Sequence, residues 1–170
     1  MSEPNPKTHR WTLIDSAANV NVETWEASGR DVTPSCPAAW SVKKFRLRGG
    51  KQEGVDVIVL DNGRLALTVV PTRGMGILEA KLGELRLGWQ SPVKEVVNPA
   101  FVNLLGRGGL GWLEGFNEWL VRCGLESNGA PEFDENGRLR YPLHGKIANT
   151  PAHKVEVAVD PQSGEITVTG

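Results

Sequence analysis

The sequence lacks the features that mark membrane, secreted or zinc-binding proteins. No apolar run approaches the roughly 20 residues that a helix needs to cross a bilayer, and the N-terminal MSEPNPKTHR has no apolar signal-peptide core. The two cysteines, Cys36 and Cys123, lie far apart and form no CxxC motif, so neither a disulfide framework nor a zinc site is indicated. We therefore expect a cytoplasmic protein with two reduced thiols.

An excess of charge of either sign is also lacking, because 19 basic residues accompany 20 acidic ones and the formal net charge is −1. Such a balance of charge gives no overall electrostatic attraction to nucleic acid or to an anionic membrane, and we expect neither partner. No group of His, Asp and Glu has a spacing that demands a metal, and we expect no cofactor. The sequence leaves homo-oligomerisation open.

Helical periodicity is scarce as well. Outside residues 110–116, where two glycines weaken the pattern, no stretch sustains the 3.6-residue period of an amphipathic helix. Short alternating segments between turn residues, with 20 glycines and 11 prolines, are typical of an all-β fold. We predict one domain, an antiparallel β-sandwich over residues 11–170, preceded by a flexible arm at residues 1–10. The expected strands cover residues 11–14, 40–48, 55–60, 64–70, 77–82, 85–89, 117–122, 154–159 and 165–169.

The pattern within these strands predicts their surroundings. Residues 40–48 alternate as a strand with one wet face, and residues 55–60 are largely apolar on both faces and therefore central. Residues 34–37 and 127–140 are expected to form a turn and a solvated loop. Nothing after residues 165–169 caps the sheet, so this strand is either a protected edge or lacks a partner, and we expect a sandwich that is incomplete at its C-terminal end.

His144 is the leading candidate for acid–base chemistry. It lies in YPLHGKIAN (residues 141–149), where Pro142 restricts the backbone and Gly145 allows a sharp turn or the close approach of a ligand. Imidazole can donate or accept a proton near neutral pH, as a general acid or base must. The alternative is a structural histidine that bonds to the loop backbone.

Two further candidates lie beside glycines. Arg73 in PTRGMG (residues 71–76) offers a planar set of donors that suits vicinal hydroxyls or a carboxylate, although a surface ion pair is the plainer interpretation. That stretch lacks the GxGxxG or GxxxxGK[ST] spacing of a phosphate loop. Trp112 lies in a glycine-rich stretch, and its indole could stack on the C–H face of a sugar ring. We expect most of the six tryptophans in the core, with Trp112 and Trp119 as exceptions.

Residues 117–126 supply additional candidates. Arg122 and Glu126 are expected to face a polar cleft, and Asn117 is counted with them as a substrate-binding residue. Cys123 could act as a nucleophile if a base lowered its pKa, but no histidine lies near it in the sequence. We therefore expect Cys123 to be a small buried apolar side chain.

Several motifs, taken in order, resemble a largely uncharacterised branch of the aldose 1-epimerase (galactose mutarotase-like) proteins. They are PTRGMGI, LGWQSP, GLGWL, CGLE and LHGKIAN, at residues 71–77, 87–92, 109–113, 123–126 and 143–149. The resemblance implies a large all-β supersandwich that binds a small-molecule sugar in a cleft on one sheet. In aldose 1-epimerases a histidine of a His-Gly motif helps to hold the sugar, a second histidine protonates the ring oxygen, and a glutamate takes the anomeric hydroxyl proton.

Only some of the family's sugar-binding and catalytic residues have a counterpart in this sequence. His144 matches the His-Gly histidine and Arg73 the sugar-contacting arginine, whereas the second histidine and the glutamate have no counterpart. Family members are longer, so the resemblance implies the N-terminal half of such a domain, with the missing acid and base beyond it. The implied function is carbohydrate binding, with mutarotase-type exchange of sugar anomers in the full-length protein. Two alternatives stay open: an isomerase or lyase acting on a keto-sugar, and a non-catalytic sugar-binding or interaction module.

Overall fold

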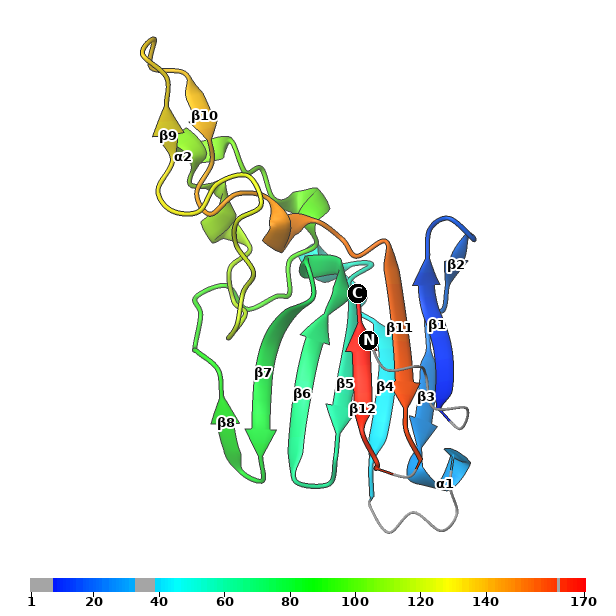
Figure 1. Cartoon of the computed structure of the whole chain (residues 1–170). Helices are drawn as coiled ribbons and strands as arrows, with labels where there is room; N and C mark the ends of the chain where they lie inside the picture. Colours follow the sequence, from blue (N-terminus) through cyan, green and yellow to red (C-terminus); the bar gives the residue numbers. More distant parts are fainter. Residues whose placement is uncertain (1–7, 33–38, 162) are drawn as a thin grey trace.

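The structure, a computed structural model, describes residues 8–32, 39–161 and 163–170. Its strands form two antiparallel sheets, and a two-stranded hairpin projects beyond them (Figure 1). The four-stranded sheet has the order β12 (Ile166–Thr169), β11 (Lys154–Val159), β1 (His9–Asp15) and β2 (Val20–Asn21). The six-stranded sheet has the order β3 (Trp25–Ser28), β4 (Ser41–Arg46), β5 (Asp56–Asp61), β6 (Leu65–Val70), β7 (Gly76–Leu82) and β8 (Leu85–Leu87). The predicted all-β antiparallel sandwich is confirmed.

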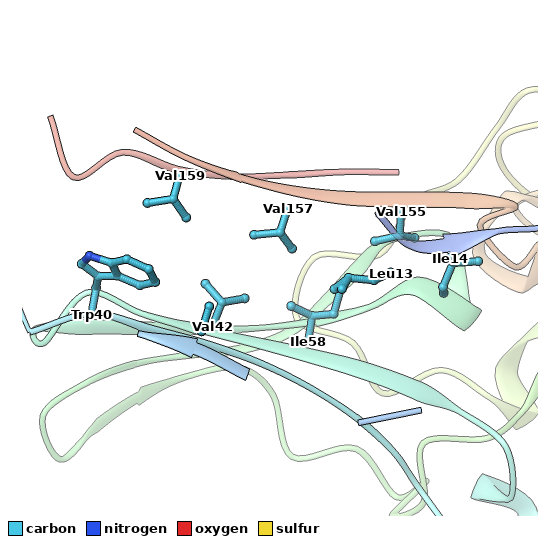
Figure 2. Close-up of a cluster of buried hydrophobic side chains, with 9 residues drawn as sticks. Leu13, Ile14, Trp40, Val42, Ile58, Val155, Val157 and Val159 are labelled. Carbon is cyan, nitrogen blue, oxygen red and sulfur yellow. The ribbon is translucent and has the colours of Figure 1, made fainter. Parts of the chain in front are cut away.

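Branched aliphatic side chains fill the space between the two sheets. Residues alternate along β11, so Val155, Val157 and Val159 all point inward and are fully buried. Figure 2 shows them opposite Val42 and Ile58 of the six-stranded sheet. Burying one such side chain stabilises the fold by about 1.5–3 kcal/mol, so this layer of contacts holds the sheets together.

A β-bulge lets β1 place two consecutive residues in this core. The pairing of β1 with β11 shifts between Thr12 and Ile14, so Leu13 is an extra residue in the ladder. Leu13 and Ile14 are therefore both buried, although neighbours on a regular strand point to opposite faces.

Strands β4 to β8 follow one another across the six-stranded sheet, as the predicted meander requires. The prediction that β5 is a central strand is also confirmed. Ile58 faces the core between the sheets, whereas Val57 packs with Val55, Val70 and Val96 on the opposite face. The segment that carries Val96 therefore covers the second face of this sheet.

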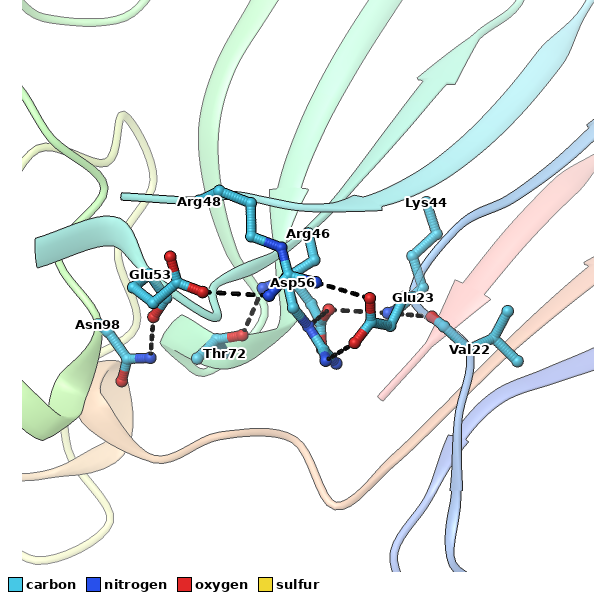
Figure 3. A network of polar contacts seen from close by, with 9 residues as sticks. All are labelled: Val22, Glu23, Lys44, Arg46, Arg48, Glu53, Asp56, Thr72 and Asn98. Atoms are coloured by element: carbon cyan, nitrogen blue, oxygen red, sulfur yellow. Dashed lines mark hydrogen bonds and ion pairs between the residues drawn. The ribbon is translucent and has the colours of Figure 1, made fainter. Parts of the chain in front are cut away.

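One end of the space between the sheets is polar. Lys44 and Arg46 alternate with their neighbours on β4, so they share a face with the buried Val42. Figure 3 shows both reaching Asp56, with Lys44 Nζ 2.8 Å and Arg46 Nε 3.0 Å from Asp56 Oδ1. The expected single wet face of this strand is confirmed, because Lys43 and Phe45 are exposed, whereas Lys44 on the opposite face is only 1% exposed. Its burial is tolerated because the carboxylate pairs with the ammonium group.

This polar cluster reaches the turn that follows β6. The backbone N–H of Asp56 donates to Thr72 Oγ1 at 2.8 Å. At the exposed rim of the cluster, Glu23 pairs with Arg46 and Arg48. The cluster therefore links β4 and β5 to the residue that precedes Arg73.

Two segments differ from their predicted structure. Residues 117–122 do not form a strand, because within the described chain they contribute only an isolated bridge between Leu120 and Ile77. The side chain of Glu118 in this segment turns inward to Arg73. Residues 127–140 contain a hairpin of β9 (Glu132–Phe133) and β10 (Leu139–Tyr141). Its turn is closed by Asp134 Oδ1, which accepts from the N–H groups of residues 136 and 138.

Helix is confined to short turns in the described residues, as predicted. Residues 110–116 contain a 3-10 turn, η4 (Gly111–Glu114), where one helical turn was expected. None of the helices described is long and apolar enough to cross a membrane. The other helical elements are α1 (Gly29–Val32), η1 (Gly50–Gln52), η2 (Pro71–Arg73), η3 (Pro99–Phe101), α2 (Gly106–Gly109) and η5 (Ile147–Asn149).

Two expectations on the termini and thiols need correction. β1 begins at His9, so the last two residues of the expected arm belong to the sheet.

Cys123 has a free, exposed thiol rather than a buried one, because it lies in an exposed loop close to Leu125, which is 89% exposed. Cys36 and the turn expected at residues 34–37 lie outside the described residues.

Candidate functional site

Three segments that are distant in the sequence meet where β6 ends and β7 begins. They are residues 71–76, 109–122 and 143–149. The backbone N–H of Leu143 donates to the carbonyl of Gly109 at 2.9 Å, and Arg122 Nη1 donates to the carbonyl of Gly74 at 3.1 Å. Gly74 has a φ of +60° and faces the carbonyl of Ile147, where a Cβ would collide with the oxygen. Glycine at this position therefore brings the first and third segments into contact.

Arg73 is the innermost residue of the first segment. It ends the tight turn η2, which Pro71 begins, and its side chain is fully buried. Nη1 donates to the carbonyl of Val97 at 3.0 Å, and Nε lies 2.9 Å from Oε1 of Glu118, which is also fully buried. Gly115 has no Cβ, and this leaves room for the guanidinium.

The charge of Arg73 is buried in the protein beside a carboxylate of opposite charge. Burial lowers the pKa of Arg73, and the Glu118 carboxylate opposes that shift. Arginine stays protonated in proteins, so a cation and a carboxylate lie side by side. Their attraction is stronger there than between exposed charges because little water screens it.

His144 occupies a strained position in the third segment. Its φ is +56°, in the left-handed region that non-glycine residues seldom adopt. Two backbone bonds hold it there: its N–H donates to the carbonyl of Gly129 at 2.9 Å, and its carbonyl accepts from Gly124 N–H at 3.2 Å. Strain of this kind persists only where surrounding contacts enforce it, and it is concentrated at functional sites.

Trp112 supports the His144 ring from inside the protein. The two rings meet edge to face with centroids 4.7 Å apart, and Phe116 stacks on Trp112 at 4.5 Å. Trp112 is only 2% exposed, so in this structure its ring is not the open wall expected for sugar stacking. The indole is covered because Phe116 and His144 pack against it, and because Gly111 lets the carbonyl of Asn103 approach the same turn.

Buried polar atoms without a hydrogen-bond partner gather at this site. Proteins satisfy nearly all such atoms, and one left unsatisfied costs about 1–3 kcal/mol. Arg73 Nε and Glu118 Oε1 count among them, because their contact is close but not aligned as a hydrogen bond. In the described part of the chain, all unpaired buried side-chain atoms belong to Arg73 (Nε, Nη2), Trp112 (Nε1), Asn117 (Oδ1), Glu118 (Oε1), His144 (Nδ1) and Asn149 (Nδ2, Oδ1).

Four of these six residues were predicted from the sequence, and two were missed. Asn117 is 7% exposed and donates from Nδ2 to the carbonyl of Glu95 at 2.8 Å. Glu118 was not singled out, although an acid between Phe116 and Trp119 is a signal of buried charge. Asn149 lies in the motif of His144, where its amide could have been noted as a polar group close to the imidazole.

Arg122 and Glu126 lie at the rim of the site. Arg122 is exposed except for its bond to Gly74, and Glu126 pairs on the surface with Lys146 at 2.9 Å. The structure thus brings Arg73, Trp112, Asn117 and His144 together but keeps these two outside the buried cluster. Among the residues described, no group of three or more His, Cys, Asp and Glu could hold a metal ion.

Comparison with known proteins agrees with this architecture. A crystal structure from Klebsiella pneumoniae subsp. pneumoniae, of a protein provisionally assigned as an aldose 1-epimerase, is similar with a TM-score of 0.89 and 43% sequence identity. The similarity covers 95% of this chain and 42% of that one, so this chain spans less than half of that protein's length. No curated protein matches.

The model of one protein family matches residues 52–170. That family is described as a domain of unknown function, DUF4432. The predicted aldose 1-epimerase-like branch is consistent with this match and with the similar crystal structure. Because the match covers more than half of the sequence, this chain belongs to the DUF4432 family.

Proposed function

We propose that this protein binds a sugar at the site of His144 and Asn149 and that in its full-length form it interconverts sugar anomers, as an aldose 1-epimerase does. The observation that carries the proposal is that the side chains of His144, its ring neighbour Trp112 and Asn149 of the same segment all have buried polar atoms without a hydrogen-bond partner. A sugar presents hydroxyl groups that donate and accept, so it can satisfy both kinds of atom. The similar Klebsiella protein supports the same class of ligand.

Each residue of the site has a distinct role in this proposal. His144 and Asn149 are half-buried, so a ligand reaches them first. His144 transfers a proton to or from a sugar oxygen, and the Asn149 amide bonds to hydroxyl groups. Arg73 and Glu118 form a fully buried ion pair that joins residues 71–76 to residues 109–122.

The decisive experiment replaces His144 with asparagine. Asparagine tolerates the left-handed backbone better than alanine does, so His144→Asn removes the imidazole with little added strain. In the full-length protein, we expect the acceleration of anomer exchange to fall by about 100-fold, the lower range for losing a general acid or base. Polarimetry of freshly dissolved α-D-glucose and α-D-galactose measures it, with circular dichroism as the check on folding. A folded variant that matches the unchanged protein would contradict the proposal.

The same assay separates the competing functions. Anomer exchange leaves every carbon-bound hydrogen in place, so we expect no deuterium on carbon when the reaction runs in deuterium oxide. Incorporation at a carbon next to the carbonyl would instead indicate an isomerase or lyase that acts on a keto-sugar. Sugar binding without any acceleration of exchange would indicate a non-catalytic binding module.

A further inference from the structure

We propose that this protein has a second sugar subsite, a pocket beside Trp89 and Asn117 that holds a neutral pyranose ring. The pocket has a volume of about 410 Å³ and opens between the β7–β8 hairpin and the segment that follows it. Small-molecule sites usually have about 300–1,000 Å³, so a single sugar ring fits. Its lining includes Leu78, Arg86, Trp89, Gln90, Lys94 and Asn117, but not Arg73, Glu118 or His144.

Trp89 supplies the apolar surface that a sugar ring needs. It is 38% exposed, whereas Trp112 is 2% exposed. Phe116 packs against it with centroids 4.9 Å apart and the planes tilted by 31°, which fixes the orientation of the indole. A held and partly exposed indole can cover the C–H face of a pyranose with little loss of side-chain entropy.

Asn117 supplies a polar atom that lacks a partner. The residue is 7% exposed, and its Nδ2 is already engaged by the carbonyl of Glu95. Its Oδ1 is buried without any hydrogen bond, and an acceptor in that state requires a donor. Asn117 lines the pocket, and a sugar hydroxyl is a donor of the kind that its amide oxygen lacks.

Two cationic side chains line the pocket, Arg86 and Lys94. Glu79 binds the Arg86 guanidinium and neutralises it. Lys94 Nζ donates to the carbonyl of Ser91 at 2.8 Å, which leaves its other N–H groups for hydroxyl oxygens. The pocket thus combines one aromatic face, one buried acceptor and one ammonium donor, a set that matches a polyhydroxylated ring.

The subsite deepens the proposed function and takes the ligand class from it, but its residues can be tested separately. Methyl glycosides suit this test because their blocked anomeric oxygen prevents ring opening. We would titrate the protein with methyl β-D-glucopyranoside and methyl β-D-galactopyranoside, and record saturation transfer to the ring protons by NMR. We expect Trp89→Ala to raise the Kd about tenfold or more, as the loss of an indole face predicts, and Lys94→Met to raise it about threefold.

Leu87→Ala is the matched control. Leu87 lies two residues from Trp89 and is 37% exposed, but it does not line the pocket, so we expect its Kd to stay within twofold. Equal binding by the unchanged protein, Trp89→Ala and Lys94→Met would overturn the subsite, as would no binding of either glycoside. Binding that depends on Trp89 in a protein without anomer exchange would keep the subsite and reject only the proposed mutarotase function.

Discussion

Nε of Arg73 lies 2.9 Å from Oε1 of Glu118, and neither side chain is exposed to solvent. The two residues come from different segments: one ends the turn after β6, and the other follows η4. Two charges taken out of water are costly, and their attraction offsets that cost only while both are present. The pair therefore fixes the relative position of the two segments that surround His144.

Removing one member of this pair should destabilise the protein strongly. Glu118→Gln leaves the Arg73 charge buried without a counter-charge, and we expect the free energy of unfolding to fall by about 3–5 kcal/mol. Urea denaturation measures the change. The exposed pair of Lys43 and Glu26, at 2.9 Å, is the control, because Glu26→Gln should change stability by at most about 1 kcal/mol. Equal effects of the two substitutions would show that the buried pair does not hold the site.

Gly74 should tolerate a side chain less well than Gly83 does. Both have a left-handed backbone, with φ of +60° and +57°, so alanine adds about 1–2 kcal/mol of strain at each. A Cβ at Gly83 meets nothing within 4 Å, whereas at Gly74 it collides with the carbonyl of Ile147. We expect thermal unfolding to show a larger loss for Gly74→Ala, by at least about 1 kcal/mol. Similar losses would mean that the two segments do not depend on this close contact.

Thr72 should stabilise the site through its hydroxyl group. Thr72→Val keeps the shape of the side chain but removes the acceptor for the N–H of Asp56, at 2.8 Å. Leaving that N–H unpaired should cost about 1–3 kcal/mol. Thr72→Ser keeps the hydroxyl and should recover much of the loss in the same denaturation experiment. If serine and valine are equally destabilising, the lost packing of the methyl group explains the effect instead.

Glu79 should make stability depend on pH below neutrality. Burial alone would raise the pKa of Glu79, but bonds and charges from Lys81 and Arg86 outweigh it, so the pKa lies below its ordinary value. A lowered carboxyl pKa stabilises the fold above the unfolded value of about 4.3, and this stabilisation is lost as the pH falls through the folded value. We expect Glu79→Gln to cost at most about 1 kcal/mol at pH 7, because solvent screens its exposed partners. The cost should shrink toward pH 3, and a constant difference across that range would contradict this assignment.

The strands were predictable because their pattern is local. Alternation along Val155, Val157 and Val159 indicates a strand with one buried face, and the structure has it. The bulge at Leu13 was not predictable, because it depends on how β1 pairs with a strand more than 140 residues away in the sequence. The same limit explains why Glu118 was missed: its inward position depends on Arg73, which lies in another segment.

By itself the sequence determined the all-β architecture, the order of the meander and the exceptional setting of His144 between Pro142 and Gly145. Those properties follow from period-two alternation and from turn residues, which act over a few neighbours. Only the tertiary structure decided that Trp112 is covered while Trp89 remains partly exposed. The tertiary structure also decided which buried polar atoms form hydrogen bonds. Burial and pairing depend on groups that are distant in the sequence, and a local pattern carries no information about which of them will meet.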